Sequence, residues 1–476
     1  MKYRYVSAEE ACSVINDGCT VGFSGFTPAG YPKVVPLRLA ERKGMRINVY
    51  TGASVGEEID TSLSGMMDLR MPYMTNDVLR NEINEGRVRY IDARIGRFPE
   101  KLRNGFYPKV DVAVVEACAL GEEGFVPTTS VGAVPTFVQQ AEKVIVELNS
   151  EQPRSLEGIH DIFLPSKPPR EPIPLRSPED RIGKTFVATG DREVLVVKTS
   201  SKDRQRTLSS PNAEHRRIAE HLVSFFQREV SAGRLPRNLL PLQSGVGNIA
   251  NAVTDGLKSS GFEHLVFYTE VLQDSILGLL RDGVADFSSS TSVTLSPPVL
   301  ERFYGEIDDF RDRIVLRPQD ISNCPEIISH LGVIAMNGAI EADIYGNVNS
   351  THIDGREMVN GIGGSEDFSS NGYLSIFFAP SVRKNNAISF IVPMVSHVDH
   401  TEHDVDVIVT EQGLADLRGK DPSGRAKEII EKCAHPAYRE KLYEYLDRCE
   451  RGHIRTNRER AEEWYTNLRD HGTMLV

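Results

Sequence analysis

The sequence predicts an α/β protein made of two similar open α/β domains with mostly parallel sheets. Short apolar runs alternate with helical patterns in both halves of the chain, and this alternation is typical of parallel sheets covered by helices on both faces. A proline-rich and polar stretch separates the two halves. A glycine loop, a helix and an apolar strand follow one another once in each half. These observations predict an N-terminal domain over residues 1–208 and a C-terminal domain over residues 209–476.

Composition and charge exclude several classes of protein. The 476 residues are 40% hydrophobic and 26% charged, which is ordinary globular composition. The net charge of −12 argues against a nucleic-acid partner, because a duplex-binding surface needs a basic excess. No apolar run is long enough to span a membrane. The N-terminus lacks the pattern of a secretory signal, and the six cysteines form no C-x-x-C pair, so we expect reduced thiols and a cytoplasmic protein.

The first half contains the predicted strands and helices of one α/β domain. The proline cluster Pro165–Pro174 predicts a crossing loop, and the polar stretch Thr199–Pro211 predicts a surface linker. Helical patterns cover Pro32–Lys43 and Asn76–Glu85. Apolar runs predict strands over Thr20–Ser24, Ile47–Tyr50, Val88–Ile91, Val110–Val115, Lys143–Glu147 and Val194–Lys198.

The second half resumes the alternation after a long helix predicted over Ala213–Ala232. The charged tail over roughly 425–470 is predicted to be helical, with Trp464, the single tryptophan, as a packing anchor. Apolar runs predict strands over Leu265–Tyr268, Ile314–Leu316, Leu331–Met336, Leu374–Phe378 and Ile388–Met394.

The two halves resemble a weak internal repeat. Gly25 lies 26 positions before Thr51, and Gly245 lies 24 positions before Thr269. Ligands of open α/β sheets bind at the carboxyl ends of the strands, so we expect the active site in the cleft between the two domains. The halves differ at one position: Thr51 is followed by glycine, whereas Thr269 is followed by Glu270.

Two glutamates follow apolar strands and each allows two interpretations. Glu270 is either an acid at the start of a helix or a carboxylate nucleophile or base at a strand end. Glu411, in Val407-Ile-Val-Thr-Glu-Gln-Gly413, is either a capping acid or a supporting acid in the same cleft.

Two glycine-rich segments are candidates for anion binding. Gln243–Asn251 follows an apolar stretch and opens a helix, and Asn360–Phe368 contains three glycines. Each is either a tight turn or a set of backbone N–H donors for a phosphate or an oxyanion. Gly183-Lys-Thr185 is not a phosphate loop, because Pro178 occupies the position of the required glycine.

A histidine-rich segment offers possible metal ligands. His397, His400 and His403 lie close to Asp399 and could supply nitrogen and oxygen ligands. No H-E-x-x-H or C-x-x-C motif accompanies them. We favour a polar loop network over a metal site, and a zinc hydrolase stays the rival interpretation.

Taken together, seven segments resemble the acetyl-CoA hydrolase/transferase family, a branch of the class I CoA-transferases. Within it the chain is most similar to succinyl-CoA:acetate and propionyl-CoA:succinate CoA-transferases. The resemblance runs from about Gly22 to Arg425. The segments that carry it are Ser24–Gly30, Thr51–Ser54, Gln243–Asn248, Tyr268–Gln273, Asp343–His352, Asn360–Gly364 and Thr410–Arg418.

The resemblance implies a CoA-transferase fold and roles for particular residues. Glu270 would carry the acyl group and then CoA, and Asn323 would orient it. The backbone N–H groups of Val246 and Gly364 would form an oxyanion hole, and Glu411 and Ser54 would lie in the same region. The CoA groove would be lined by Gly245, Val246, Gly247, Asn248, Ile249, Ile340, Asn360, Gly364 and Lys384.

The implied activity is transfer of CoA between small carboxylic acids, with succinate and acetate or propionate as the pair. The route would pass through an acyl-glutamyl anhydride and a glutamyl-CoA thioester. The resemblance implies no cofactor, no metal and a homodimer, with acyl-CoA and a small carboxylate as substrates. The alternatives are an acyl-CoA hydrolase on the same scaffold, a non-catalytic acyl-CoA sensor and the zinc hydrolase.

Overall fold

The computed structural model describes residues 2–204 and 210–475. The chain divides into two compact units. Unit 1 comprises residues 1–207, 266–331 and 360–367, and unit 2 comprises 208–265, 332–359 and 368–476. Part of the predicted linker Thr199–Pro211, residues 205–209, lies outside the described residues. The predicted boundary at residues 208 and 209 stays a prediction, since compactness assigns two segments of the second half to unit 1.

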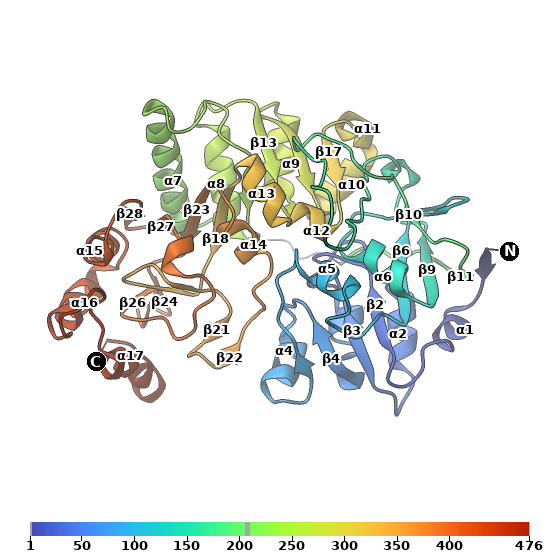
Figure 1. The fold of residues 1–476 in the computed structure, drawn as a ribbon, viewed down its shortest axis with the longest axis horizontal. Coiled ribbons are helices and arrows are strands. Elements are labelled where there is room, and N and C mark those ends of the chain that lie inside the picture. Colours follow the sequence, from blue (N-terminus) through green and yellow to red (C-terminus); the bar gives the residue numbers. More distant parts are fainter. Residues whose placement is uncertain (1, 205–209, 476) are drawn as a thin grey trace. The chain divides into compact units, whose positions relative to one another are not determined.

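Unit 1 is built on an eight-stranded sheet whose neighbouring strands are all parallel (Figure 1). The central strand β6 has six buried residues, as expected of a strand covered on both faces. In spatial order, the strands are β1 (Tyr3–Tyr5), β11 (Val194–Thr199), β9 (Lys143–Asn149), β6 (Val112–Ala117), β2 (Thr20–Phe23), β3 (Ile47–Tyr50), β4 (Met67–Met71) and β5 (Arg89–Tyr90).

Six α-helices and a small sheet accompany this sheet in the described residues 2–204. The α4 helix begins where Asn76 accepts a hydrogen bond from the N–H of Leu79 at 3.0 Å, an N-cap that satisfies one free donor of the first turn. The helices are α1 (Ala8–Cys12), α2 (Val34–Ala40), α3 (Glu57–Asp60), α4 (Asp77–Asn84), α5 (Phe98–Arg103) and α6 (Val134–Gln140). The small sheet contains β7 (Ala119–Leu120), β8 (Gly124–Val126) and β10 (Val187–Ala188).

Residues 266–331 pack against the N-terminal part of unit 1. The N–H of Val131 donates to the carbonyl of Thr291 at 3.0 Å, and Arg317 forms a buried ion pair with Asp161. The elements of this stretch are β13 (Leu265–Tyr268), β14 (Val271–Leu272), α9 (Asp274–Arg281), β15 (Ala285–Ser290), β16 (Ser292–Val293), α10 (Pro297–Gly305), α11 (Ile307–Phe310), β17 (Ile314–Leu316), α12 (Gln319–Ser322) and α13 (Pro325–Leu331).

Unit 2 contains a run of parallel strands closed by the antiparallel strand β28. The long helix α7 packs on α8 and on β27. The main elements are β12 (Leu242–Ser244), β18 (Ile334–Gly338), β23 (Leu374–Phe378), β27 (Val407–Thr410), β28 (Gly413–Asp416), α7 (Ala213–Ser231) and α8 (Asn248–Lys258). Short elements are β19 (Glu341–Asp343), β20 (Val348–Asn349), β21 (His352–Ile353), β22 (Glu357–Met358), α14 (Ser365–Ser369), β24 (Val382–Arg383), β25 (Ile388–Ser389) and β26 (Ile391–Val392).

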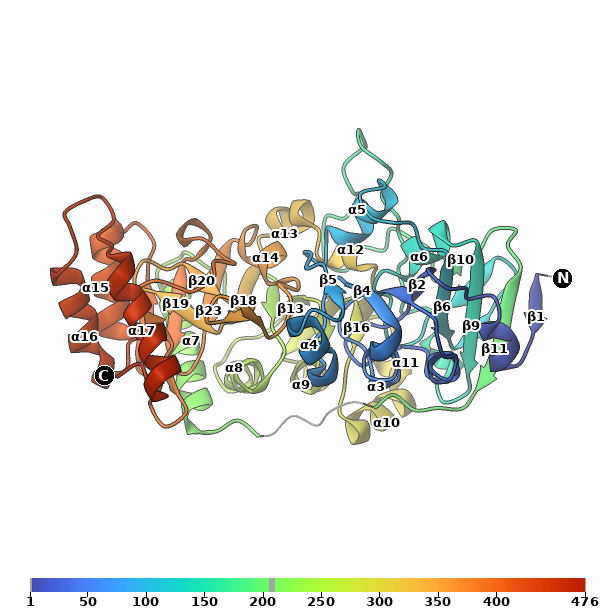
Figure 2. The same ribbon diagram turned by 90° about the horizontal axis from the view of Figure 1, so that it is seen from below.

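Three helices at the C-terminal end of the chain lie together in both views (Figures 1 and 2). They are α15 (Pro422–Lys432), α16 (Pro436–Asp447) and α17 (Arg458–His471). Trp464 is 3% exposed and belongs to the apolar core that these helices share with β27 and β28. The helical tail and its tryptophan anchor are therefore confirmed.

The strand order supports the internal repeat when each run is read by itself. The strands β27-β23-β18-β12 of unit 2 stand in the same spatial order as the strands β11-β9-β6-β2 of unit 1. The strands β13-β15-β17 likewise stand in the same spatial order as β3-β4-β5. Corresponding strands therefore follow one another in the same spatial order, and the glycine loops of the repeat follow β2 and β12.

One predicted strand is wrong, and two strands of five or more residues, β4 and β15, were not predicted. The predicted strand Ile388–Met394 is wrong as one element, since it forms the separate short strands β25 and β26. Strand β15 was missed because it ends in three serines, which lack the apolar pattern. Those serines are fully buried, and Ser289 accepts a hydrogen bond from Arg317 at 2.9 Å. Strand β4 was missed because Asp68 and Arg70 interrupt its apolar residues.

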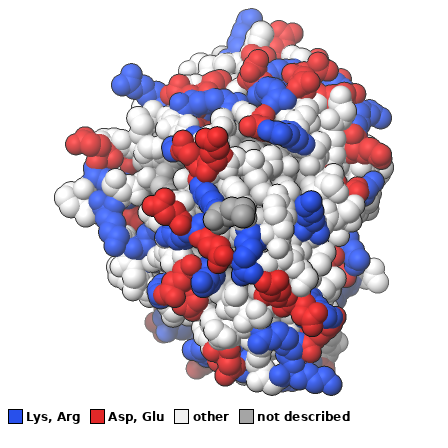
Figure 3. All heavy atoms as spheres, turned by 90° about the vertical axis from the view of Figure 1, so that its right-hand side faces the viewer, with Lys and Arg blue, Asp and Glu red and all other residues white. Residues whose placement is uncertain are grey.

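On the face of unit 1 in Figure 3, basic and acidic side chains are interspersed.

All six cysteines are unpaired thiols, as the sequence predicts. In the described part of the chain, no helix combines the length and the apolar character needed to cross a bilayer.

Candidate active site

Glu270 lies directly after β13, in the short turn that leads to β14. Its backbone carbonyl accepts hydrogen bonds from the N–H groups of Thr291 and Ser292, at 2.9 and 3.1 Å. The side chain is partly buried. The buried strand β13 and these two bonds fix the backbone of Glu270, so that its carboxylate has a defined direction at the carboxyl end of a strand.

Asn323 contacts the Glu270 carboxylate directly. Its Nδ2 donates to Glu270 Oε1 at 2.8 Å, and the side chain is fully buried. Asn323 ends α12, which is held by Tyr268: the tyrosine hydroxyl donates to the carbonyl of Ile321 at 2.5 Å. Because Tyr268 precedes Glu270 by two residues, the same strand end positions both the carboxylate and its hydrogen-bond donor.

Further side chains fix α12. Gln319 Nε2 donates to the carbonyl of Ile95 at 2.8 Å. Arg103 and Asp320 form an ion pair at 2.6 Å, and both side chains are nearly inaccessible to solvent. Such a support is what holds a reacting group in one geometry.

Gly364 borders Glu270 so closely that no side chain fits there. A Cβ atom at this position would lie 2.0 Å from Glu270 Oε1 and 2.2 Å from Asn323 Nδ2. The constraint is steric, since the positive-φ glycines do not include Gly364. The glycine therefore lets backbone approach the carboxylate, as an N–H donor to an oxyanion must.

The segment that carries Gly364 is anchored on the loop after β5. Asp92 accepts two hydrogen bonds from the N–H of Ile362, at 3.0 and 2.9 Å. The N–H of Ile95 donates to the carbonyl of Gly363 at 3.1 Å. Arg94 forms an ion pair with Glu366. These contacts place residues 360–367 in unit 1, although the surrounding sequence belongs to unit 2.

Burial opposes the ionisation of Glu270. It raises the pKa of Glu270 to about 7, although the hydrogen bond from Asn323 acts in the opposite direction. Val271, the next residue, belongs to a small buried apolar cluster with Phe26, Ala53 and Ile95, and Tyr73 packs against this cluster. Perturbed carboxylates of this kind mark functional sites.

Two other predicted residues of unit 1 lie in neighbouring loops. Ser54 follows β3 next to Ala53 of the apolar cluster, and its hydroxyl lies 2.7 Å from that of Thr75. Asn360 begins the segment of Gly364, and its Nδ2 donates to the carbonyl of Gly361 at 2.9 Å. The structure thus brings Glu270, Asn323 and Gly364 into contact, with Ser54 and Asn360 on adjoining loops.

The predicted CoA-groove residues 245–249 belong to unit 2. Gly245 donates its N–H to the carbonyl of Met336 at 3.0 Å. Val246 is 60% exposed, and Gly247 has a φ of 135° directly before α8. Asn248 and Ile249 open that helix. This positive φ requires glycine and turns the chain from β12 into the helix.

The remaining predicted residues of unit 2 also follow strand ends. Ile340 comes after β18, and its N–H donates to the carbonyl of Asn349 at 2.8 Å. Lys384 is exposed in the turn between β24 and β25, where its φ is 49°. Their predicted roles, like those of residues 245–249, stay predictions.

Glu411 follows β27 and is surrounded by donors. Its carboxylate accepts from the Ser381 N–H at 2.8 Å, from the Ser381 hydroxyl and from Gln412 Nε2 at 2.8 Å. Burial opposes ionisation, but these hydrogen bonds outweigh it and hold the pKa of Glu411 below its ordinary value.

The histidine-rich segment forms hydrogen bonds and a ring contact within unit 2. His400 is fully buried, with Nδ1 3.1 Å from Ser369 Oγ and Nε2 3.3 Å from Ser350 Oγ. The ring of His397 lies against that of His352. Across residues 2–204 and 210–475, no group of three or more acidic, histidine or cysteine side chains is arranged to hold a metal ion.

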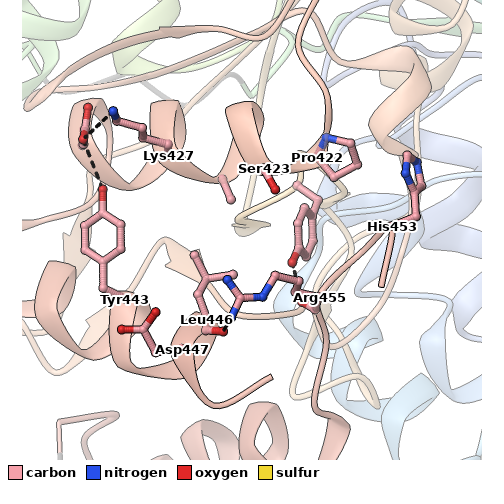
Figure 4. Close-up of a pocket in the computed structure, with 11 residues that line it drawn as sticks. Pro422, Ser423, Lys427, Tyr443, Leu446, Asp447, His453 and Arg455 are labelled. Carbon is pink, nitrogen blue, oxygen red and sulfur yellow. Dashed lines mark hydrogen bonds and ion pairs between the residues drawn. The ribbon is translucent and has the colours of Figure 1, made fainter. Parts of the chain in front are cut away.

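A cavity of about 400 Å³ lies in unit 2 beside α15 and α16 (Figure 4). Lys427 and Tyr443 both reach Glu431, and Arg455 hydrogen-bonds the carbonyl of Leu446 at 2.5 Å. None of the predicted site residues lines it. It is therefore distinct from the surroundings of Glu270.

Asp367 is the residue at this site that the sequence analysis missed. It is fully buried, and its Oδ2 accepts a hydrogen bond from the N–H of Gly96 at 2.8 Å. Its position in the glycine-rich segment Asn360–Phe368 was the available signal. An acid in such a loop is usually exposed, so only the fold shows that it is buried next to Asn323.

Comparisons with known proteins identify relatives over the whole chain. Sequence models of the acetyl-CoA hydrolase/transferase N-terminal and C-terminal domains match residues 2–197 and 300–446. A succinyl-CoA:acetate CoA-transferase of Clostridium kluyveri is 47% identical over 100% of this chain and 90% of its own length. A propanoyl-CoA:succinate CoA transferase of Escherichia coli is 44% identical, covering 99% of this chain and 98% of its own.

A third relative and two solved structures are also similar to this chain. An acetyl-CoA hydrolase of Saccharomyces cerevisiae is 44% identical over 98% of this chain and 94% of its own. RipA from Yersinia pestis has a TM-score of 0.72 at 22% identity, covering 93% of this chain and 96% of its own. A 4-hydroxybutyrate CoA-transferase from Porphyromonas gingivalis has a TM-score of 0.65 at 21% identity, covering 94% and 97%. These two structures show the fold alone.

Proposed function

Because this chain belongs to the acetyl-CoA hydrolase/transferase family, a family of enzymes, we propose that it moves CoA between small carboxylic acids. Succinate paired with acetate or propionate is the proposed substrate pair, since two relatives carry those names. The observation that carries the proposal is the contact of Glu270 with Asn323 Nδ2 at 2.8 Å, beside backbone at Gly364 that leaves no room for a side chain.

In the proposed reaction, the ionised Glu270 carboxylate attacks the carbonyl carbon of the acyl-CoA thioester. The C–S bond breaks, which gives an acyl-glutamyl anhydride and CoA thiolate. The thiolate then attacks the glutamyl carbonyl, the anhydride C–O bond breaks, and the first acid leaves as a carboxylate. The glutamyl-CoA thioester remains. The second acid enters as a carboxylate and the two steps run in reverse.

The surroundings of Glu270 support this role. Burial raises the pKa of Glu270. Its ionised carboxylate is therefore less stabilised by water and is a more reactive nucleophile than a fully hydrated one. Each step forms an oxyanion, and one backbone donor to an oxyanion is worth about 2.7–4 kcal/mol of barrier. The N–H of Gly364 is the proposed donor in unit 1, whereas the role of Val246 stays a prediction.

Hydrolysis is the second candidate function, because a 44% identical yeast relative is named an acetyl-CoA hydrolase. The same glutamyl intermediates would then be discharged by water. The two functions differ in whether loss of the thioester needs an added carboxylate. Homodimer formation and a cytoplasmic location stay predictions.

The intact mass of the protein after mixing with succinyl-CoA or acetyl-CoA, without acceptor acid, tests the proposal. We expect a mass gain equal to CoA less water, mapped to Glu270 and removed by acetate or succinate. Steady release of CoA with an unchanged mass would favour hydrolysis. No release and no adduct with either thioester would contradict both functions.

A further inference from the structure

Two carboxyl groups, those of Glu270 and Asp367, lie close to Asn323. Asn323 Nδ2 donates to Glu270 Oε1 at 2.8 Å. Asp367 Oδ2 accepts from the N–H of Gly96 at 2.8 Å, and Gly96 packs against Asn323, because a Cβ at Gly96 would lie 2.8 Å from Asn323 Cβ. Glu270 and Asp367 are also close enough for the charge of Glu270 to disfavour ionisation of Asp367. Two buried negative charges this close repel each other strongly.

We propose that Asp367 is a positioning residue that holds a proton while Glu270 is ionised, so that the pair carries a single negative charge around the Asn323 amide. This inference rests on the proposed function of Glu270. The proton keeps the second carboxyl neutral, and the only charge then lies on the group that attacks the thioester.

The packing of Asp367 supports a neutral group. Its side chain is fully buried, and its Oδ2 accepts from the N–H of Gly96 at 2.8 Å. The nearby guanidinium of Arg94 is engaged by Glu366. Burial raises the pKa of Asp367 to about 8, while the Gly96 hydrogen bond and Arg94 lower it and Glu270 raises it further. The charged and titratable groups around the pair are Asp92, Arg94, Glu366 and Tyr73.

The two carboxyl groups lose their protons in a defined order, which leaves a single negative charge on Glu270. Asp367 is fully buried, whereas Glu270 is only partly buried and accepts from Asn323 Nδ2, so Glu270 ionises first. Burial raises the pKa of Glu270 to about 7 and that of Asp367 to about 8. The pair therefore carries one charge in the interval between the two, as coupled carboxyls do. Above it, Asp367 ionises as well, and a second buried charge would repel the developing oxyanion and the entering carboxylate.

The proposal predicts a bell-shaped dependence of kcat/KM on pH for the wild-type protein. Activity rises as pH rises through about 7, where Glu270 ionises, and falls above about 8, where Asp367 ionises. A wild-type profile that stays flat up to pH about 9.5 would overturn the proposal, and this result requires no variant.

The variant Asp367→Asn tests the assignment of the alkaline decline. Asparagine has the same shape and can still accept from the N–H of Gly96, but it cannot ionise. We expect the decline above pH 8 to disappear, with the acid limb kept and kcat/KM at pH 7 within about threefold of wild type. Asp367→Ser, which also cannot ionise, should remove the decline too.

Glu366→Gln is the matched control. Glu366 is the adjacent acid in the chain and pairs with Arg94, so its loss should leave the alkaline decline in place. A decline that persists in both Asp367 variants would overturn the inference. Absence of a CoA adduct at every pH in the wild type would instead contradict the proposed function, so the two failures are distinguishable.

Discussion

Glu270 and Glu411 follow the same local sequence but occupy opposite environments. Each comes after a buried strand and a threonine, as Tyr268-Thr-Glu and as Val409-Thr-Glu. Glu270 accepts from one side chain, Asn323, next to a small apolar cluster, and burial raises its pKa to about 7. Glu411 accepts from Ser381 and Gln412, which hold its pKa below the ordinary value.

The comparison shows that the number of donors decides what a strand-end acid can do. A carboxylate with several donors is stabilised as an anion and is a poor nucleophile, because attack would break those bonds. A buried carboxylate with a single side-chain donor is less stabilised as an anion and stays more reactive. In the first half of the repeat, Gly52 occupies the corresponding position, so that half provides no such group.

The largest expected effect separates the two acids by substitution. Glu270→Gln should lower the rate of CoA transfer by about 10³-fold or more and abolish the covalent adduct, because the proposed nucleophile is lost. Glu411→Gln should still form the adduct. Steady-state rates together with intact masses check both statements. An adduct in Glu270→Gln, or none in Glu411→Gln, would break the comparison.

A smaller effect is expected when the carboxylate is displaced but not removed. Gly364→Ala would place a Cβ 2.0 Å from Glu270 Oε1, and a shift of about 1 Å at a reacting group costs about 10²-fold in rate. We expect kcat to fall by about this factor, with little change in melting temperature.

Gly278→Ala is the matched control for that variant. Gly278 lies in α9 of the same unit, and an added Cβ meets nothing within 4 Å. Alanine at this helical position should leave kcat unchanged and stabilise the protein by about 0.5–1 kcal/mol. Equal losses of kcat in both variants would show that glycine at 364 does not act on the carboxylate.

The smallest expected effect concerns Glu411 and the dependence of protein stability on pH. Because its pKa is lowered on folding, Glu411 contributes stability above the ordinary carboxyl pKa, and this contribution is lost as pH falls through the lowered value. Glu411→Gln should therefore destabilise by about 1–3 kcal/mol at pH 7 and by less in acid. Melting temperatures from pH 7 to pH 3 check this, with the exposed Glu440→Gln as control. A constant difference would contradict it.

The fold was largely predictable because periodicity reports local burial. Strands such as β6, β9 and β23 have continuous apolar runs, and α7 has a long helical pattern, so both were predicted close to their observed bounds. Strand β15 was not predictable, because its three buried serines depend on packing with Arg317. The local sequence around them resembles a loop.

The site was predictable only in part. Motif resemblance pointed to Glu270, Asn323 and Gly364, and the structure places them in contact. Asp367 escaped prediction, because nothing local distinguishes a buried acid from an exposed one in a glycine-rich loop. Its burial depends on Gly96, which is 271 positions away.

The sequence by itself determined the α/β class, the repeat of a glycine loop, helix and strand, and the family, because these depend on local patterns and motifs. Only the tertiary structure decided how many hydrogen-bond donors each buried acid receives. That property is set by residues distant along the chain: Asn323 for Glu270, Gly96 for Asp367, and Ser381 for Glu411. Desolvation and hydrogen bonding act through space, so a pKa is a property of the fold.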